Sequence, residues 1–220
     1  MSTIDIIKQR HSVRRFKDIP LDLKTVEQLN QEIEVCNKES GLHIQLITNE
    51  PEAFQGEKPS YGQFKGCKNY LMIIGPKGMD IEAGYYGERI VLKAQELGVN
   101  SCWVALTYKK NKAKGIIAPE EKLYLVIALG YGETNGVPHK SKPVSKLCSI
   151  PEKDLPNTPA WFQEGLEAAI LAPTALNQQK FIVSLEGDKP VIKSKGGPLT
   201  QLDLGIVKYN FEAASGHKCK

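Results

Sequence analysis

Two glycine-bounded helices, far apart in the chain, place the strongest constraint on how this sequence can fold. Residues 87–98 and 205–216 both run from glycine to glycine over the same length, with apolar, helix-forming residues between. A helix, a loop and a strand precede each of them, at 26–47 and at 166–185. Self-similarity of this kind predicts an internal duplication with a short second copy. Chance similarity between two amphipathic helices is the alternative explanation.

The other patterns mix helices and strands without regular alternation. Asp22 can cap a helix whose apolar stripe is Leu23, Val26, Leu29 and Ile33. A continuous apolar run predicts a central strand at 70–76. The remaining expected elements are helices at 4–10, 82–97, 161–171 and 202–215, strands at 42–47, 101–107, 122–130, 181–185 and 191–193, and a proline-rich linker at 132–159. This mixture predicts an α+β fold, in which a sheet is flanked by helices.

Composition narrows the class of protein. Hydrophobic residues at 41% and charged residues at 25% are typical of a globular protein. The net charge of +4 is small and no segment interleaves basic with aromatic residues, so we expect no nucleic-acid partner. No run approaches the roughly 18 apolar residues of a membrane span. Five cysteines without a C-x-x-C pair predict reduced thiols and a cytoplasmic protein, and we expect no metal site, even at His217 and Cys219 on a frayed tail.

Two polar segments can carry chemistry. In Ala172–Gln179, a proline stops a helix, and the small and amide side chains after it can meet a planar polar ligand. Near the other end of the chain, Arg10, His11, Ser12 and Arg14 place two guanidiniums around a hydroxyl, a set of donors that suits a phosphate. An exposed arginine cluster is the structural alternative.

Lys140 and Lys142 form a further basic pair. They are one residue apart in an extended segment, so they point to opposite faces, and we expect only one of them to reach a ligand.

Four segments together resemble the signatures of the nitroreductase-like flavoproteins. They are RHSVRRF at 10–16, GVNSCWV at 98–104, GYG at 130–132 followed by KSKP at 140–143, and APTALNQQ at 172–179. The resemblance covers nearly the whole chain and implies a mainly antiparallel sheet flanked by helices. It also implies FMN as the cofactor, held in that family between two identical subunits.

One departure from the family pattern bears on architecture. The resemblance implies that the signature at 172–179 belongs early in the chain, but the corresponding place, 34–40, lacks it. This is similar to the subfamily of nitroreductases whose two halves are fused. We therefore predict an internal pseudo-dimer, with a first half at 1–145 and a truncated second half at 146–220. One FMN site per chain and a monomer follow.

The resemblance also implies a role for each candidate residue. Arg10, His11, Ser12 and Arg14, with Lys140 and Lys142, would hold the phosphate and ribityl chain of FMN. Pro173, Thr174, Ala175 and Asn177 would line the flavin ring, and the backbone of Ala105 and Leu106 would present an N–H near its N5 atom. Candidates for the rim of the site are Tyr61, Phe64, Lys65 and Asn69, and Tyr85 and Tyr86 could face its pocket, with a structural role as the alternative for each.

The implied activity is that of an FMN-dependent NAD(P)H oxidoreductase. The resemblance implies a ping-pong cycle in which a hydride passes from NAD(P)H to the flavin and then to a nitro compound, a quinone or a similar small-molecule electron acceptor. Family members often have glycine where this chain has Ala105 and Leu106, and Gln178-Gln179-Lys180 lacks the usual proline and aromatic residue. These departures leave a non-catalytic flavin- or nucleotide-binding protein as the alternative function. Flavin-fragmenting or dehalogenating chemistry on the same fold is a third possibility.

Overall fold

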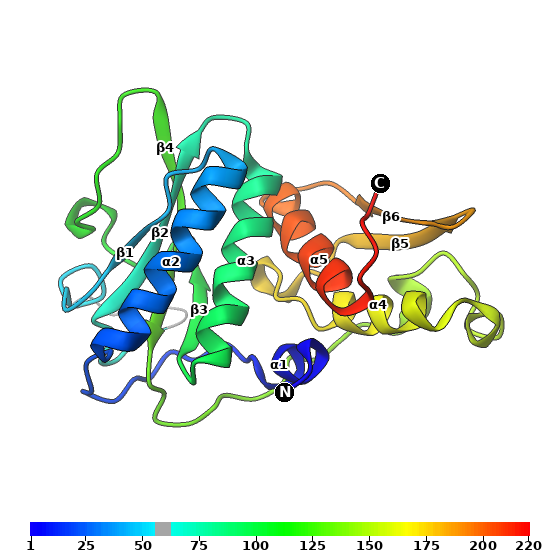
Figure 1. The fold of residues 1–220 in the computed structure, drawn as a ribbon, viewed down its shortest axis with the longest axis horizontal. Coiled ribbons are helices and arrows are strands. Elements are labelled where there is room, and N and C mark those ends of the chain that lie inside the picture. The colour runs from blue at the N-terminus through cyan, green and yellow to red at the C-terminus, as the bar shows by residue number, and fades with distance from the viewer. Residues whose placement is uncertain (56–62) are drawn as a thin grey trace. The chain divides into compact units, whose positions relative to one another are not determined.

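The computed structural model describes residues 1–55 and 63–220, and the chain forms two compact units. Residues 9–79 and 90–137 make up what we call the sheet unit. Residues 1–8, 80–89 and 138–220 make up the hairpin unit. Helix α3, Asp80–Glu96, contributes its first part to the hairpin unit and the remainder to the sheet unit (Figure 1). The predicted boundary between residues 145 and 146 concerns the ancestry of the two halves and stays a prediction.

An antiparallel sheet forms the core of the sheet unit. Its strands are β1 (Gln45–Ile47), β2 (Asn69–Pro76), β3 (Asn100–Val104) and β4 (Glu121–Gly130), in the order β1-β2-β4-β3. The predicted central strand is confirmed, because β2 is buried from Asn69 to Gly75 and pairs with strands on both sides. The strand predicted at 101–107 ends earlier, at Val104, so that Ala105 and Leu106 lie in the connection that follows it.

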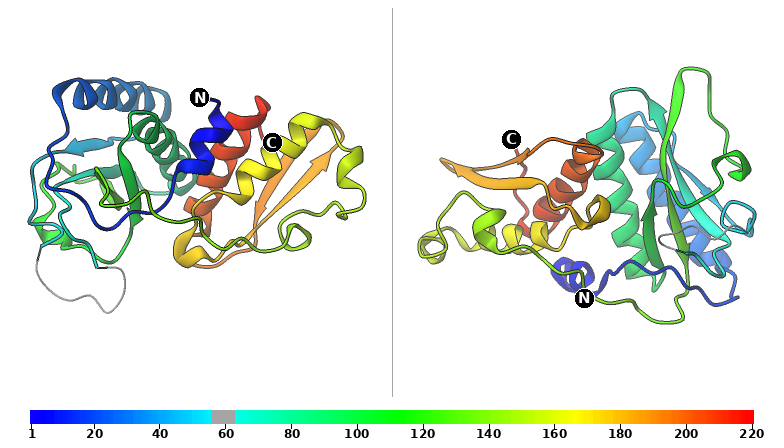
Figure 2. Two further views of the ribbon diagram at one scale, coloured as in Figure 1. Left: turned by 90° about the horizontal axis from the view of Figure 1, so that it is seen from below. Right: turned by 180° about the vertical axis from the view of Figure 1, so that it is seen from behind.

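Helix α2, Leu23–Ser40, covers one face of this sheet (Figure 2). The predicted cap is confirmed, since the Asp22 side chain accepts a hydrogen bond from the backbone N–H of Thr25 at 2.9 Å. The predicted apolar stripe was partly wrong, because Leu23, in the first helical position, is 89% exposed. The buried side chains of α2 are Thr25, Leu29, Ile33 and Cys36.

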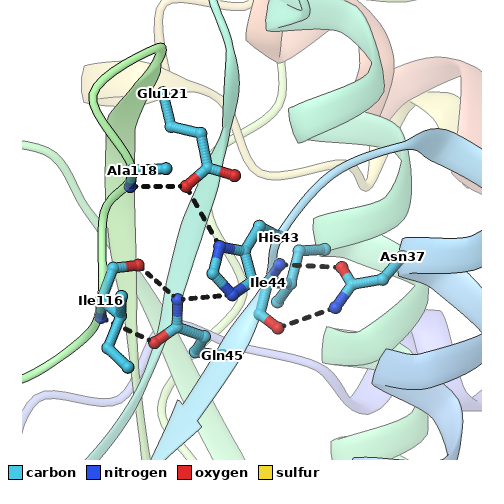
Figure 3. Close-up of polar contacts among 7 residues, drawn as sticks. All are labelled: Asn37, His43, Ile44, Gln45, Ile116, Ala118 and Glu121. Carbon is cyan, nitrogen blue, oxygen red and sulfur yellow. Dashed lines mark hydrogen bonds and ion pairs between the residues drawn. The ribbon is translucent and has the colours of Figure 1, made fainter.

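A polar cluster joins the segment around β1 to the connection before β4 (Figure 3). His43 Nδ1 lies 3.1 Å from Glu121 Oε2, and Gln45 Nε2 lies 3.1 Å from His43 Nε2. The Gln45 amide is oriented by Ile116, whose backbone N–H donates to Oε1 and whose carbonyl accepts from Nε2. The Gln45 nitrogen therefore faces His43 as a donor, which leaves Nε2 as the acceptor and places the ring hydrogen on Nδ1.

The hairpin unit is built from helices α4 (Ala160–Ile170) and α5 (Thr200–Ser215) and the hairpin β5 (Phe181–Glu186) and β6 (Lys189–Ser194). Helix α1, Thr3–Gln9, is linked to α4 by an ion pair of 2.7 Å between Lys8 and Glu167. Helices α4 and α5 pack closely because Gly165 leaves room for the Phe211 ring, which would lie 2.6 Å from a Cβ at that position. Short 3₁₀ turns occur at Lys110–Lys112, Val144–Lys146, Leu155–Asn157 and Ala175–Asn177.

Helices α3 and α5 touch through their backbones. A Cβ added to Gly84 would lie 1.9 Å from the carbonyl oxygen of Leu202. A Cβ added to Gly205 would likewise lie 1.9 Å from the carbonyl oxygen of Ile81. Only glycine allows so close an approach at these two positions.

The C-terminal residues are bound to the hairpin unit, so the prediction of a frayed tail was wrong. The His217 ring stacks on Trp161 with centroids 3.9 Å apart, and the Cys219 backbone N–H donates to Glu212 at 2.9 Å. Lys218 Nζ lies 2.7 Å from both Tyr85 Oη and Glu212 Oε2. Burial, together with donation to Glu212, raises the pKa of Tyr85 to about 12. No helix in the described part of the chain is long and apolar enough to cross a membrane.

Candidate functional site

The basic signature lies in the sheet unit as an extended segment beside β3. The Val13 N–H donates to the Ser101 carbonyl at 2.9 Å, and Phe16 donates to the Lys65 carbonyl at 2.8 Å. The Val13 and Phe16 side chains are buried. Between and beside these anchors, Ser12 is exposed and Arg14 is half-buried.

The arginines of this segment have different surroundings. Arg15 forms an ion pair with Glu133 at 3.1 Å, whereas the Arg14 guanidinium has no hydrogen bond or ion pair to any other described residue. Arg10 is buried. Burial raises the pKa of the Cys102 thiol, while Arg14, a hydrogen bond from Ser12, and Arg10 oppose that rise. All three residues therefore lie close enough to Cys102 to act on its thiol.

The sheet unit also contains the predicted site residues His11, in the basic signature, and Ala105 and Leu106, directly after β3. His11 Nδ1 lies within hydrogen-bond distance of the Asn135 carbonyl, at 3.1 Å. Ala105 is half-buried, and the Leu106 side chain is 86% exposed.

In the hairpin unit, the segment Ala172–Gln179 forms a compact turn after α4. Pro173 is buried, Thr174 and Ala175 are half-buried, and Asn177 is exposed. Leu176, Asn177 and Gln179 have φ values of 51°, 52° and 44°. Left-handed conformations cost about 1–2 kcal/mol per non-glycine residue, so surrounding contacts must hold this turn in shape.

The extended segment Lys140–Lys142 provides many of these contacts. The Asn177 and Gln179 side-chain amides donate to the Lys140 carbonyl at 2.9 and 3.0 Å, and the Lys142 N–H donates to Gln179 Oε1 at 2.8 Å. Gln179 is 2% exposed, so these bonds form in a nearly dry environment. The turn and the predicted lysine segment are thus brought together.

The two lysine side chains have different partners. Lys142 Nζ donates to the Gln178 carbonyl at 2.5 Å and lies 3.4 Å from that of Gln179. The exposed Lys140 ammonium has no hydrogen bond or ion pair within the described ranges. The two ammonium groups therefore differ in their surroundings, and the expectation that only one of them reaches a ligand stays a prediction.

The rim candidates are scattered. Tyr61 lies outside the described residues. Phe64 packs on Phe54 with centroids 4.9 Å apart, and Lys65 forms a 3.0 Å ion pair with Glu133. Asn69 lines a small cavity of about 240 Å³ in the sheet unit, together with Lys68 and Asp18.

Tyr85 and Tyr86, by contrast, belong to the hairpin unit. Their rings pack edge to face with centroids 5.2 Å apart, and Tyr85 also packs on Tyr209 at 5.0 Å. With its hydroxyl bonded to Glu212, Tyr85 has a structural role in this unit.

One acidic residue was missed by the sequence predictions. Asp203 on α5 is 5% exposed and accepts hydrogen bonds from the Ala175 N–H and the Gln178 side chain. Burial raises the pKa of Asp203, and these two hydrogen bonds oppose that rise. The only signal in the sequence is an acidic residue in the first turn of a helix, which is ordinarily explained by the helix dipole.

Comparison with solved structures places the fold. A nitroreductase structure from Thermotoga maritima MSB8 matches with a TM-score of 0.67 and 23% identity, over 97% of this chain and 83% of that one. A nitroreductase from Desulfovibrio desulfuricans, solved in complex with FMN, matches with a TM-score of 0.52 and 17% identity, over 68% of this chain and 96% of that one. A structure described as an NADH dehydrogenase/NAD(P)H nitroreductase from Parabacteroides distasonis matches with a TM-score of 0.51 and 16% identity, over 66% of this chain and 95% of that one.

These likenesses confirm the predicted α+β, nitroreductase-like fold with an antiparallel sheet and flanking helices. No curated protein matches the chain. The sequence profile of the family described as "Putative TM nitroreductase" matches residues 2–215. The chain therefore belongs to this nitroreductase family.

Proposed function

We propose that the protein is an FMN-dependent NAD(P)H oxidoreductase that reduces small electron-poor acceptors such as nitro compounds or quinones. Its family membership supports the reaction class. The FMN complex of the Desulfovibrio relative, which shares the fold, supports the choice of cofactor.

The Arg14 guanidinium is the observation that carries this proposal. It has no hydrogen bond or ion pair to another described residue, although its neighbour Arg15 is paired. Val13 and Phe16 anchor the segment around it, and the exposed Ser12 supplies a hydroxyl donor nearby. Planar guanidinium and hydroxyl donors fit the phosphate of FMN, which is dianionic near neutral pH.

In the hairpin unit, the turn with Pro173, Thr174, Ala175 and Asn177 would line the flavin ring, and Lys140 would add a positive charge. Small side chains and a buried proline fit a flat ring. In the sheet unit, a backbone N–H of Ala105 or Leu106 would lie near the N5 atom of the flavin. When bound, FMN would supply the redox chemistry by accepting a hydride from NAD(P)H and passing it to the acceptor. The residues of the chain would bind and orient it, and no side chain is required as an acid or base.

The proposal includes the pseudo-dimer. Of the two flavin sites that a symmetric dimer would have, the pseudo-dimer would keep one, so it would hold one FMN per chain and would not need to dimerise. A measured stoichiometry of two FMN per chain, or an obligate homodimer, contradicts this part of the proposal.

The absorption spectrum of the purified protein tests the function. We expect flavin bands, or their appearance after FMN is added, and loss of these bands on anaerobic mixing with NADH or NADPH. A protein that binds no FMN under these conditions contradicts the proposal.

The alternative of a flavin-binding protein without catalysis has one observation in its favour. Ala105 and the highly exposed Leu106 stand where the resemblance implies glycine, and a side chain there can obstruct approach to the ring. A flavin-loaded protein that stays oxidised with both NADH and NADPH supports this alternative.

A further inference from the structure

The turn at Ala172–Gln179 is held by hydrogen bonds of its own and by contacts from two other elements. Within the turn, the Asn177 N–H donates to the Thr174 carbonyl at 2.9 Å and the Gln179 N–H donates to Thr174 Oγ1 at 3.0 Å. Leu176, Asn177 and Gln179 are all left-handed, a conformation that only glycine adopts easily. The segment Lys140–Lys142 supports its outer part through Asn177 and Gln179. A different element, helix α5, supports its beginning.

Asp203 is the residue of α5 that supports the beginning of the turn. Its Oδ1 accepts the Ala175 N–H at 2.9 Å, and its Oδ2 accepts Gln178 Nε2 at 2.7 Å. Gln178 Nε2 also donates to the Pro198 carbonyl at 3.1 Å, just before α5. One carboxylate therefore ties two points of the turn, on either side of the left-handed pair, to the first part of α5.

The chemistry of these contacts explains why an aspartate stands here. The two donors approach two different oxygens, and an asparagine offers only one acceptor oxygen. A carboxylate that is 5% exposed is costly unless its oxygens are hydrogen-bonded, so this placement is stable only while the turn keeps its shape. The dependence is mutual, since both the carboxylate and the turn need the same two bonds.

We propose that Asp203 is a positioning residue that fixes Ala175 and Gln178, and with them the turn that would line the flavin ring. This inference rests on the proposed function. Asp203 acts through the turn and does not itself touch the ligand.

The test compares Asp203→Asn with Asp188→Asn, the same chemical change at an exposed position in the β5–β6 turn. Hydrogen exchange of the Ala175 amide in the flavin-free protein reads the turn directly. FMN titration measures the effect of the turn on the Kd for FMN. Loss of one hydrogen bond to a charged group should speed Ala175 exchange and raise the Kd for FMN by about 10- to 100-fold. Asp188→Asn should change neither.

The visible spectrum of the bound flavin separates positioning from a general loss of stability. At saturating FMN, the absorption maxima of Asp203→Asn should shift from those of the wild type, because the groups that line the ring have moved. Spectra that superimpose, or an unchanged Kd, overturn the positioning role even if the variant unfolds more easily. If Asp203→Asn does not fold, Gln178→Met removes the bond to Asp203 Oδ2 together with the bond to the Pro198 carbonyl, and it should shift exchange, Kd and spectrum in the same direction.

The two proposals fail in different ways. A wild-type protein that binds no FMN overturns the proposed function, and the positioning role falls with it. A wild-type protein that binds FMN, with an Asp203→Asn variant that binds it equally well, overturns the inference alone.

Discussion

Gly84 and Gly205 make the same contact in opposite directions. A Cβ on Gly84 would meet the carbonyl of Leu202 and the amide of Ile206, three residues before and one residue after Gly205. A Cβ on Gly205 would meet Ile81 and Tyr85, three before and one after Gly84. Such reciprocity is typical of a two-fold interface, where residue i contacts j and j contacts i. It supports the proposal that α3 and α5 descend from equivalent helices.

Replacing Gly84 by alanine should destabilise the protein by about 3 kcal/mol, near the upper end for overpacking, because the obstacle is a backbone carbonyl that cannot rotate away. Gly205→Ala should cost about the same. Urea unfolding measures both. Gln201→Ala, at an exposed position of α5, is the control and should stay within about 0.5 kcal/mol of the wild type. Equal stabilities for Gly84→Ala and Gln201→Ala would show that the two helices are not in backbone contact.

The fold was largely predictable because its signals are local. The cap at Asp22, the buried strand β2 and the strands expected at 181–185 and 191–193 all follow from short patterns, and each is present in the structure. Local patterns also explain the errors. Leu23 fits an apolar stripe by spacing, yet its position in the first turn leaves it in solvent.

Contacts between residues that are far apart in the chain were harder to predict from the sequence. Sequence comparison paired Gly87 with Gly205, whereas the residue in reciprocal contact with Gly205 is Gly84, almost one helical turn away. Asp203 meets Ala175 only because α5 returns to the turn, and no spacing rule indicates that contact. The left-handed Leu176 was equally hidden, since leucine carries no preference for that conformation.

Arg14 and Arg15 provide a matched test of phosphate binding. Arg14→Ala should weaken FMN binding by about 1–3 kcal/mol, or roughly 5- to 150-fold in Kd, because an available guanidinium is lost. Arg15→Ala removes the same charge from the next residue, but its guanidinium is bonded to Glu133. We expect it to change the Kd much less. Fluorescence titration of FMN measures both, and equal effects would indicate that only the net charge of the segment matters.

The cluster around Glu121 should make stability depend on pH. The Ala118 N–H and the His43 side chain hold the pKa of Glu121 below its ordinary value of 4.5. Ionised Glu121 therefore stabilises the fold above pH 4.5, and this contribution is lost as the pH falls through the lowered pKa.

Denaturant unfolding at several pH values checks this expectation. The difference in unfolding free energy between wild type and Glu121→Gln should be largest near neutral pH and shrink as the pH falls below about 4.5. Glu120→Gln, at the exposed neighbouring position, should show no such trend. A difference that is constant from pH 7 to pH 3 would contradict the assignment.

Substitutions of Lys140 and Lys142 should have different effects, one on ligand binding and the other on the stability of the turn. Lys142→Gln removes the ammonium that donates to the Gln178 carbonyl, so it should speed hydrogen exchange in the turn before any flavin is added. Lys140→Gln should leave that exchange unchanged, because only the backbone carbonyl of Lys140 contacts the turn. It should instead raise the Kd for FMN and reduce its dependence on salt, since an exposed cation facing an anionic ligand is screened by ions. If Lys140→Gln loosens the turn and leaves FMN affinity intact, the two lysines have the opposite roles.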